Sequence, residues 1–189
     1  MNKINEKRLF IAIPIGDIIK PVLSVLKSKF TRNSKNIKWI PSENIHLTLE
    51  FVGNISINYI PILIQSLKQD IIQNSFKLEI ELTGVFPSSH SPRMLWLGIK
   101  RGTEELMSLH TQINRSLEII TANKTILTFT PHITIAKIPQ KFVNIDVLPF
   151  LNTVYSPIEL DVNSICLFES QLFQEGAKYR ILNEFPLNR

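Results

Sequence analysis

Two short stretches of the chain alternate polar and apolar residues in the same order. Residues 46–49 read His-Leu-Thr-Leu, and residues 132–135 read His-Ile-Thr-Ile. Because successive side chains of an extended strand point to opposite faces, each stretch would place its histidine and threonine on one face and two aliphatic side chains on the other. We therefore predict two half-buried strands, each presenting an imidazole and a hydroxyl side by side.

The apolar pattern elsewhere predicts a mixture of strands and helices. Strands are expected at residues 8–15, 45–52, 76–82, 94–100, 158–162, 164–169 and 178–182, and helices at residues 17–30, 56–74 and 102–121, with a short one near 146–151. Asp17 and Ser56 are plausible N-caps of the first two helices. Helices and strands thus share one chain without a linker between its halves, which is typical of an α+β domain.

The chain also contains similar stretches that are separated by a constant number of residues. His46 and His132 lie 86 positions apart, and the apolar stretches at residues 9–13 and 95–99 have the same separation. Self-similarity at a constant offset is typical of a duplicated structural unit. We predict a single bilobal domain over residues 1–189, with half-units that begin near residues 8 and 94 and two lobes that meet along the motif strands.

Composition narrows the class of protein. The chain has 189 residues, of which 44% are hydrophobic and 20% charged, as in a globular domain. No apolar run approaches the roughly 20 residues that span a membrane, and the apolar stretch after Arg8 lacks a signal-peptide cleavage site. The one cysteine, Cys166, excludes an intrachain disulfide. We expect a monomeric cytoplasmic protein with no membrane contact, and its net charge of +5 favours anionic partners.

Two imidazoles and two hydroxyls on facing strands could perform acid–base chemistry on a phosphate ester. Imidazole titrates near pH ~6.5, so one ring can be neutral while the other is protonated. One ring could take a proton from water while the other protonates a leaving oxygen, and the hydroxyls of Thr48 and Thr134 could donate hydrogen bonds to phosphate oxygens. The set contains no nucleophilic side chain. It therefore favours phosphodiester cleavage by water or by the substrate's own oxygen, with a strained 2′,3′-cyclic phosphate as the natural target.

Other readings of the motifs remain open. A catalytic zinc ion usually has three protein ligands, and only Glu50, which a regular strand would place on the face of His46, could join the histidines, so we expect no metal and no other cofactor. A phosphodiesterase for small cyclic nucleotides and a non-catalytic RNA-binding module are the alternatives. Two histidines favour an enzyme, because anion binding alone could use arginine or lysine. His90 is expected in an exposed loop, and His110 in helix packing.

The paired His-Xaa-Thr-Xaa motifs resemble those of the two-histidine (2H) phosphoesterases, and in particular their LigT-like branch, the RNA 2′,3′-cyclic phosphodiesterases also called 2′,5′ RNA ligases. The resembling stretches lie, in the order of the family, at residues 8–13, 44–53, 95–98, 129–135, 167–170 and 176–179. The resemblance implies a bilobal α+β fold, in which two pseudo-twofold-related lobes of antiparallel sheet and helices surround a central cleft.

The resemblance also implies an activity and roles for residues. It implies metal-independent hydrolysis of a terminal 2′,3′-cyclic phosphate of RNA to a 2′-phosphate, with reversible 2′,5′ ligation as a related reaction. His46 would protonate the departing 3′ oxygen, and His132 would activate water. The motifs alone do not distinguish these two roles.

One position departs from the family pattern. Many relatives have arginine three residues after the second threonine, where this chain has Lys137, which keeps the charge but loses the two-pronged contact with phosphate. In a regular strand Lys137 would point away from His132, so only a strand end or a bulge would turn it toward a ligand. Arg93 and Tyr179 are further candidates for substrate binding, as a cation at the cleft and as a ring for base stacking.

Overall fold

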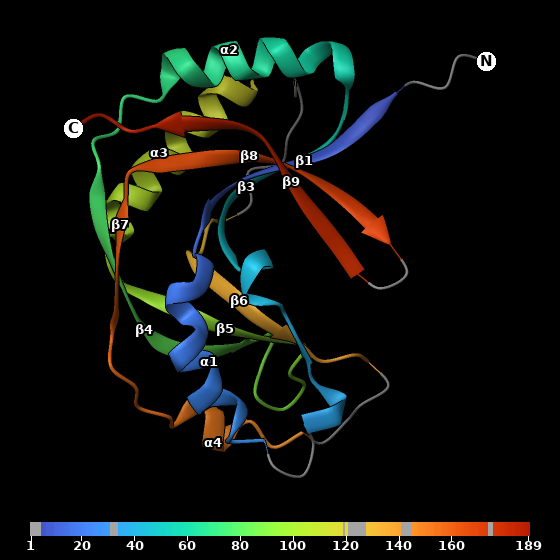
Figure 1. Ribbon diagram of the computed structural model, residues 1–189, viewed down its shortest axis with the longest axis vertical. Coiled ribbons are helices and arrows are strands. Elements are labelled where there is room, and N and C mark those ends of the chain that lie inside the picture. Colours follow the sequence, from blue (N-terminus) through green and yellow to red (C-terminus); the bar gives the residue numbers. More distant parts are fainter. Residues whose placement is uncertain (1–4, 31–33, 119, 121–127, 141–144, 174–175) are drawn as a thin grey trace.

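The fold is built on one antiparallel sheet. The computed structural model describes residues 5–30, 34–118, 120, 128–140, 145–173 and 176–189, and all statements below refer to these. The strands are β1 (Glu6–Pro14), β2 (Lys38–Trp39), β3 (His46–Ser56), β4 (Phe76–Phe86), β5 (Met94–Arg101), β6 (His132–Lys137), β7 (Ile158–Val162), β8 (Ser164–Phe173) and β9 (Gly176–Pro186). They lie in the order β7-β4-β5-β6-β3-β1-β8-β9, and β2 pairs with β6 (Figure 1).

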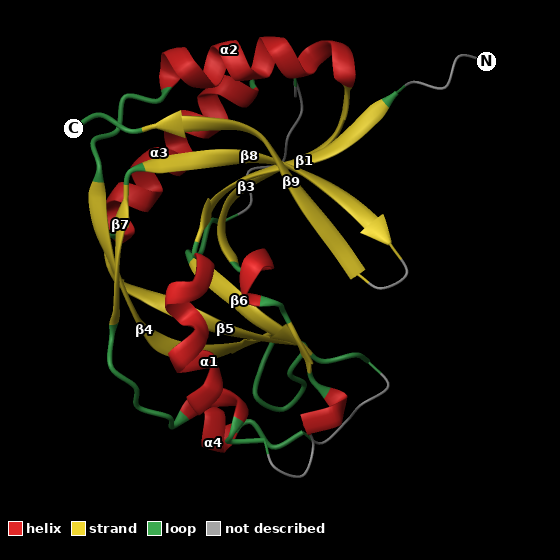
Figure 2. Ribbon diagram, in the orientation of Figure 1, coloured by secondary structure: helices red, strands yellow, loops and turns green. Residues whose placement is uncertain are grey.

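The helices form two groups, one beside each half of the sheet. They are α1 (Lys20–Lys27), α2 (Ile60–Asp70), α3 (Thr103–Leu117) and α4 (Leu148–Leu151). Figure 2 shows α2 and α3 together near β8, whereas α1 and α4 lie near β4 and β5. No described helix is both long and apolar enough to cross a bilayer.

The motif strands β3 and β6 are neighbours at the middle of the sheet. One lobe contains β3, β1, β8 and β9, and the other contains β6, β5, β4 and β7. The lobe with β3 takes strands from both ends of the described chain, because β8 pairs with β1, whereas the other lobe contains the consecutive strands β4 to β7. The predicted bilobal α+β fold is thus confirmed, and β2, from the first half of the chain, pairs with β6 of the other lobe. Their origin by internal duplication stays a prediction.

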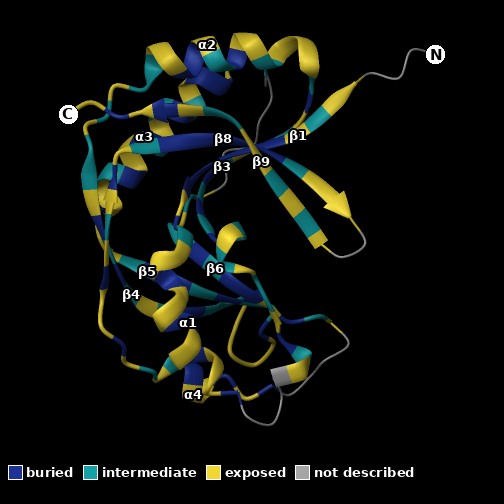
Figure 3. Ribbon diagram, in the orientation of Figure 1, coloured by how far each residue is buried: buried dark blue, intermediate teal, exposed yellow. Residues whose placement is uncertain are grey.

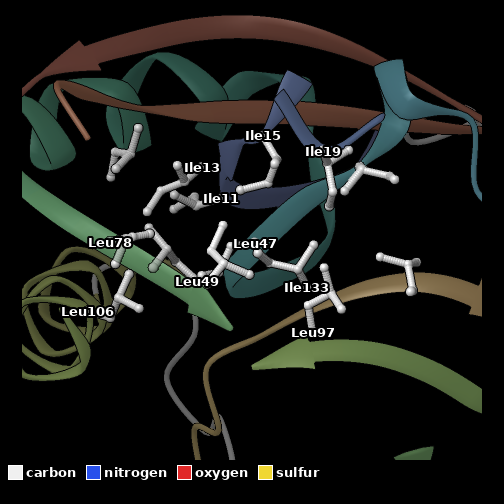
Figure 4. Close-up of a cluster of buried hydrophobic side chains, with 14 of the residues drawn as sticks. Ile11, Ile13, Ile15, Ile19, Leu47, Leu49, Leu78, Leu97, Leu106 and Ile133 are labelled. Atoms are coloured by element: carbon white, nitrogen blue, oxygen red, sulfur yellow. The ribbon is translucent and has the colours of Figure 1, made fainter. Parts of the chain in front are cut away.

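The aliphatic side chains of the two motifs form the centre of the hydrophobic core. Leu47 and Ile133 are 0% exposed, and Leu49 and Ile135 are buried beside them. Figure 4 shows Leu47, Leu49 and Ile133 among side chains from β1, β4 and β5. The neighbouring strands are buried along most of their middle length, as Figure 3 shows. Burial of one face therefore fixes the face on which His46 and His132 lie.

Several element boundaries differ from the sequence-based predictions. α1 begins at Lys20 and not at Asp17, whose carboxylate accepts hydrogen bonds from Lys20 Nζ (2.7 Å) and Ser42 Oγ (3.2 Å) instead of capping the helix. Ser56 ends β3 and occupies the N-cap position of the 3-10 turn Ile57–Tyr59 that leads into α2, but its side chain makes no capping hydrogen bond. α3 ends at Leu117; of the other positions predicted as helix, residues 118 and 120 lie in a turn, and residues 119 and 121 lie outside the described residues.

Candidate active site

The two motifs form a compact group of four polar side chains. β3 and β6 pair through Leu47 and Ile133, so the antiparallel register places His46 opposite Thr134 and Thr48 opposite His132. All four point away from the buried face. In such a pair, opposite Cβ atoms are about 5 Å apart and diagonal ones, such as those of the two histidines, about 7–8 Å apart. A phosphate group fits between side chains at this spacing.

Both imidazoles are held by the backbone in the same way. His46 Nδ1 lies 2.7 Å from the carbonyl oxygen of Asn44, and His132 Nδ1 lies 2.7 Å from that of Thr130. A carbonyl oxygen can only accept, so Nδ1 must be the protonated nitrogen of each neutral ring. Nε2 is therefore the nitrogen of both residues that can exchange a proton with a substrate.

His46 lies among aromatic rings that come from three other strands. Its ring centroid is 4.8 Å from that of Phe10 on β1 and 6.2 Å from that of Phe168 on β8. The Tyr179 ring on β9 meets it edge-on, at 5.1 Å and 90°. Burial among these rings lowers the pKa of His46; the Asn44 hydrogen bond opposes this and the positive charge of Lys137 adds to it.

Among the residues that the structure describes, His132 has fewer ring neighbours than His46, and they come from the lobe of β4 and β5. The Phe86 ring on β4 lies edge-on at 5.1 Å, and the Trp96 ring on β5 lies at 6.2 Å. Trp96 packs across Gly84, where an added Cβ would overlap the indole. The lobe thus needs glycine at this position to seat the tryptophan beside His132.

A β-bulge in β6 brings Lys137 to the face of the histidines. Trp96 pairs with Thr134, but Leu95 pairs with Ala136, so Ile135 is an extra residue in β6. Ile135 and Ala136 are both buried, and the alternation is reset after them. Lys137, opposite Met94, therefore shares the face of Thr134, and its charge acts on His46. The bulge that this position requires is present.

A matching bulge in β3 turns Glu50 away from this face, so the predicted placement of Glu50 beside His46 is wrong. Ala12 pairs with Thr48, whereas Ile11 pairs with Glu50, which leaves Leu49 as the extra residue. Glu50 instead lies on the core side, where its Oε2 is 3.1 Å from His110 Nε2. Among the described residues no group of three or more histidine, cysteine, aspartate or glutamate side chains could hold a metal ion.

The other predicted substrate-binding residues differ in their distance from the histidines. Tyr179 directly contacts His46, and burial raises the pKa of its hydroxyl while the charge of Arg8 opposes the rise. Arg93 lies just before β5, where its Nη1 donates a hydrogen bond of 3.4 Å to the carbonyl of Pro139. Contacts of Arg93 and Tyr179 with substrate stay predictions.

The remaining histidines and the cysteine lie outside this group. His90 is exposed, and His110 stacks on Phe129 at 4.4 Å on the helix side of the sheet, as predicted for each. Cys166 is buried beside Phe10 and Phe168, and burial raises the pKa of its thiol to about 11. A thiol with this pKa is protonated at neutral pH and a poor nucleophile.

Sequence reasoning missed the rings around the histidines. Phe10, Trp96 and Phe168 lie in stretches that were predicted only as strands, and Phe86 follows such a stretch. The one available signal was the offset, because Phe10 and Trp96 are also 86 residues apart. It indicates that each histidine lies beside an aromatic residue of the neighbouring strand.

The sequence comparisons agree with this arrangement. The profile of the family described as LigT like Phosphoesterase matches residues 13–96. An RNA 2′,3′-cyclic phosphodiesterase from Aquifex aeolicus is 32% identical over 159 residues, which cover 79% of this chain and 81% of that protein. One from Thermotoga maritima is 29% identical over 184 residues and covers 94% of each chain.

Solved structures share the fold over nearly the whole chain. A crystal structure of a phosphoesterase matches with a TM-score of 0.81 at 22% identity, covering 98% of this chain and 100% of that one. Escherichia coli LigT in its apo form matches with a TM-score of 0.76 at 21% identity, covering 98% and 99%. With the sequence relatives, these matches lead to one conclusion: the chain belongs to the LigT-like phosphoesterase family.

Proposed function

We propose that this protein hydrolyses the 2′,3′-cyclic phosphate at the end of RNA chains to a 2′-phosphate, without a metal ion. The observation that carries the proposal is the pair His46 and His132, on adjacent strands and one face, with each Nδ1 tied to a backbone carbonyl. Relatives named RNA 2′,3′-cyclic phosphodiesterase support the substrate class. E. coli LigT, which shares the fold, was crystallised with phosphate and with 3′-AMP.

The proposed reaction needs one proton acceptor and one proton donor. Neutral His132 removes a proton from water through Nε2, and the water oxygen forms a bond to phosphorus. The bond from phosphorus to the 3′ oxygen breaks, its electron pair stays on that oxygen, and protonated His46 supplies the proton through its Nε2. The products are a 2′-phosphate and a 3′-hydroxyl, and solvent then restores both rings. Such acid–base catalysis contributes on the order of 10²- to 10⁴-fold in rate.

The lowered pKa of His46 matters for its role as acid. In the unliganded protein, burial favours the neutral ring, which cannot donate from Nε2. A phosphate anion between the two rings favours the charged form and raises the pKa again. Substrate binding itself would thus charge His46, and burial among the aromatic rings would favour release of that proton to the leaving oxygen.

Three further side chains would stabilise the negative charge that develops on phosphorus. Thr48 and Thr134 would each donate a hydroxyl hydrogen bond to a non-bridging oxygen. Lys137, on the same face through the β6 bulge, would add a positive charge. We place the enzyme in the cytoplasm as a monomer that acts on RNA ends.

Product analysis with a defined substrate tests this proposal. We expect adenosine 2′,3′-cyclic phosphate, alone or at the end of a dinucleotide, to yield only the 2′-phosphate by phosphorus NMR, with the same rate in excess EDTA. Adenosine 3′,5′-cyclic phosphate serves as the control and should not turn over. A 3′-phosphate product, or activity that EDTA removes and zinc restores, would contradict the proposed mechanism.

A further inference from the structure

The two motif strands carry different side chains at equivalent places. Both strands bulge directly after the threonine, so the third residue beyond it returns to the histidine face. In β6 that residue is Lys137, and in β3 it is Phe51. The site therefore has a cation beside one motif and an aromatic ring beside the other.

Phe51 presents its ring to solvent. It is 62% exposed, an unusual exposure for a phenylalanine. Its ring centroid is 6.3 Å from that of Phe10, which is buried beneath it and lies 4.8 Å from His46 and 5.0 Å from Phe168. The exposed ring thus lies on a layer of aromatic side chains that continues to His46.

A cation lies on the same face, farther from His46. Arg8 precedes Phe10 by two residues in β1 and pairs with Asn54 of β3, so its side chain projects on the face of Phe10. Its positive charge acts on Tyr179, the residue that meets His46 edge-on. Phe51 is therefore linked to His46 through Phe10, and Arg8 is linked to His46 through Tyr179.

Beyond Arg8 the sheet opens into a cavity. The pairing of β1 with β8 ends at Leu9 and Glu169, and a cavity of about 930 Å³ lies where the strands separate. Amide and hydroxyl groups of Asn5, Asn54, Ser170 and Gln171 line it together with Lys7 and Arg8. Of its two carboxylates, Glu6 is exposed, and Glu169 is neutralised by Lys7 at 2.9 Å and Arg180 at 2.8 Å.

We propose that Phe51, Arg8 and this cavity, here called the upstream surface, hold the nucleotides that precede the cyclic phosphate in single-stranded RNA. The inference rests on the proposed function. A cyclic phosphate ends its chain at the 3′ side, so only one strand leaves the site, and it must leave along one of the lobes. A ring for base stacking, a guanidinium for phosphate and amides for ribose are the groups that bind single-stranded RNA.

The test compares an oligonucleotide with a mononucleotide that carries the same terminal cyclic phosphate. Phe51→Ala should lower the ratio of kcat/KM for a tetranucleotide to kcat/KM for the mononucleotide about tenfold, the usual weight of one base stack. Arg8→Gln should lower the same ratio and reduce the salt dependence of log kcat/KM for the tetranucleotide by about 0.7. Ile62→Ala and Lys68→Gln, which change exposed residues of α2, are the controls and should leave the ratio and the slope unchanged.

A binding measurement distinguishes a failure of this inference from a failure of the proposed function. A fluorescent tetranucleotide that ends in a 2′-phosphate should bind Phe51→Ala and Arg8→Gln about tenfold more weakly than the parent protein by anisotropy. If the parent does not hydrolyse cyclic phosphates but shows these differences, the proposed function fails and the upstream surface stands. If the parent hydrolyses both substrates and neither variant changes the ratio or the binding, the upstream surface is wrong.

Discussion

The His46 and His132 sites share their backbone geometry and differ in their surroundings. Each ring donates through Nδ1 to the carbonyl two residues earlier, at 2.7 Å in both cases. His46 lies among three aromatic side chains from its lobe, whereas His132 contacts two from the other lobe. The shared contact fixes which nitrogen moves a proton. Burial among its aromatic neighbours lowers the pKa of His46, and such differences in surroundings allow two equal motifs to take unequal roles.

The largest effect should come from the histidines themselves. His46→Ala and His132→Ala should each lower kcat/KM for a 2′,3′-cyclic nucleotide about 10²-fold or more, because each removes a proton-transfer group. His90→Ala, in an exposed loop, is the matched control and should match the parent protein. Steady-state kinetics measure all three.

A substrate with a p-nitrophenolate leaving group sharpens this comparison, because that group departs without a proton. His46→Ala should lose far less activity on such a diester than on the cyclic nucleotide, whereas His132→Ala should lose similarly on both. The opposite pattern would exchange the two assigned roles.

Lys137 should have the next largest effect. Lys137→Met should raise KM for the cyclic nucleotide about tenfold, because it removes a charged partner of the phosphate. Lys137→Arg should restore binding, and Lys68→Met on α2 is the control. An unchanged KM in Lys137→Met would mean that Lys137 is a solvated residue at the end of a strand.

The threonines should matter less than Lys137. Thr48→Ala and Thr134→Ala each remove one neutral hydrogen-bond donor, which corresponds to a loss of several-fold in kcat/KM. Thr48→Ser and Thr134→Ser keep the hydroxyl and should stay near the parent value. A loss in the serine variants as large as in the alanine variants would indicate a packing role instead of a hydrogen bond to substrate.

The smallest expected effect is on the titration of His46. Burial and the charge of Lys137 both lower its pKa, so Lys137→Met should raise it, and inorganic phosphate should raise it in the parent protein. The signal of the imidazole ring in a proton NMR titration measures both changes, and Lys68→Met should cause neither. A pKa that falls or stays constant in Lys137→Met would contradict the placement of Lys137 beside His46.

The alternation of residues 46–49 and 132–135 was sufficient to predict the strands, their buried faces and the meeting of the lobes. It failed directly after each threonine, because a bulge arises from the pairing of two strands and cannot be predicted from the regular alternation of one. Glu50 was therefore placed on the wrong face, and the face of Lys137 was left open. The carbonyls that hold the imidazoles were beyond prediction for the same reason, since they are backbone atoms whose positions depend on the turn before each strand.

The aromatic surroundings of His46 depend on the whole sheet. Phe168 and Tyr179 come from β8 and β9, near the end of the chain, and reach His46 only because β8 pairs with β1. No local pattern contains that pairing. The sequence thus predicts the candidate catalytic groups, and the long-range pairing of strands determines the surroundings of each group.

A double-mutant cycle tests most directly whether the two histidines act as one pair. The measurement is kcat/KM of the parent protein, His46→Ala, His132→Ala and the double variant on one 2′,3′-cyclic nucleotide, each checked for folding by circular dichroism. Residues that serve the same transition state are strongly non-additive, so we predict that the double variant is only a few-fold slower than either single variant. Near-normal turnover in the single variants, or a double variant whose loss equals the product of two independent losses, would contradict the account.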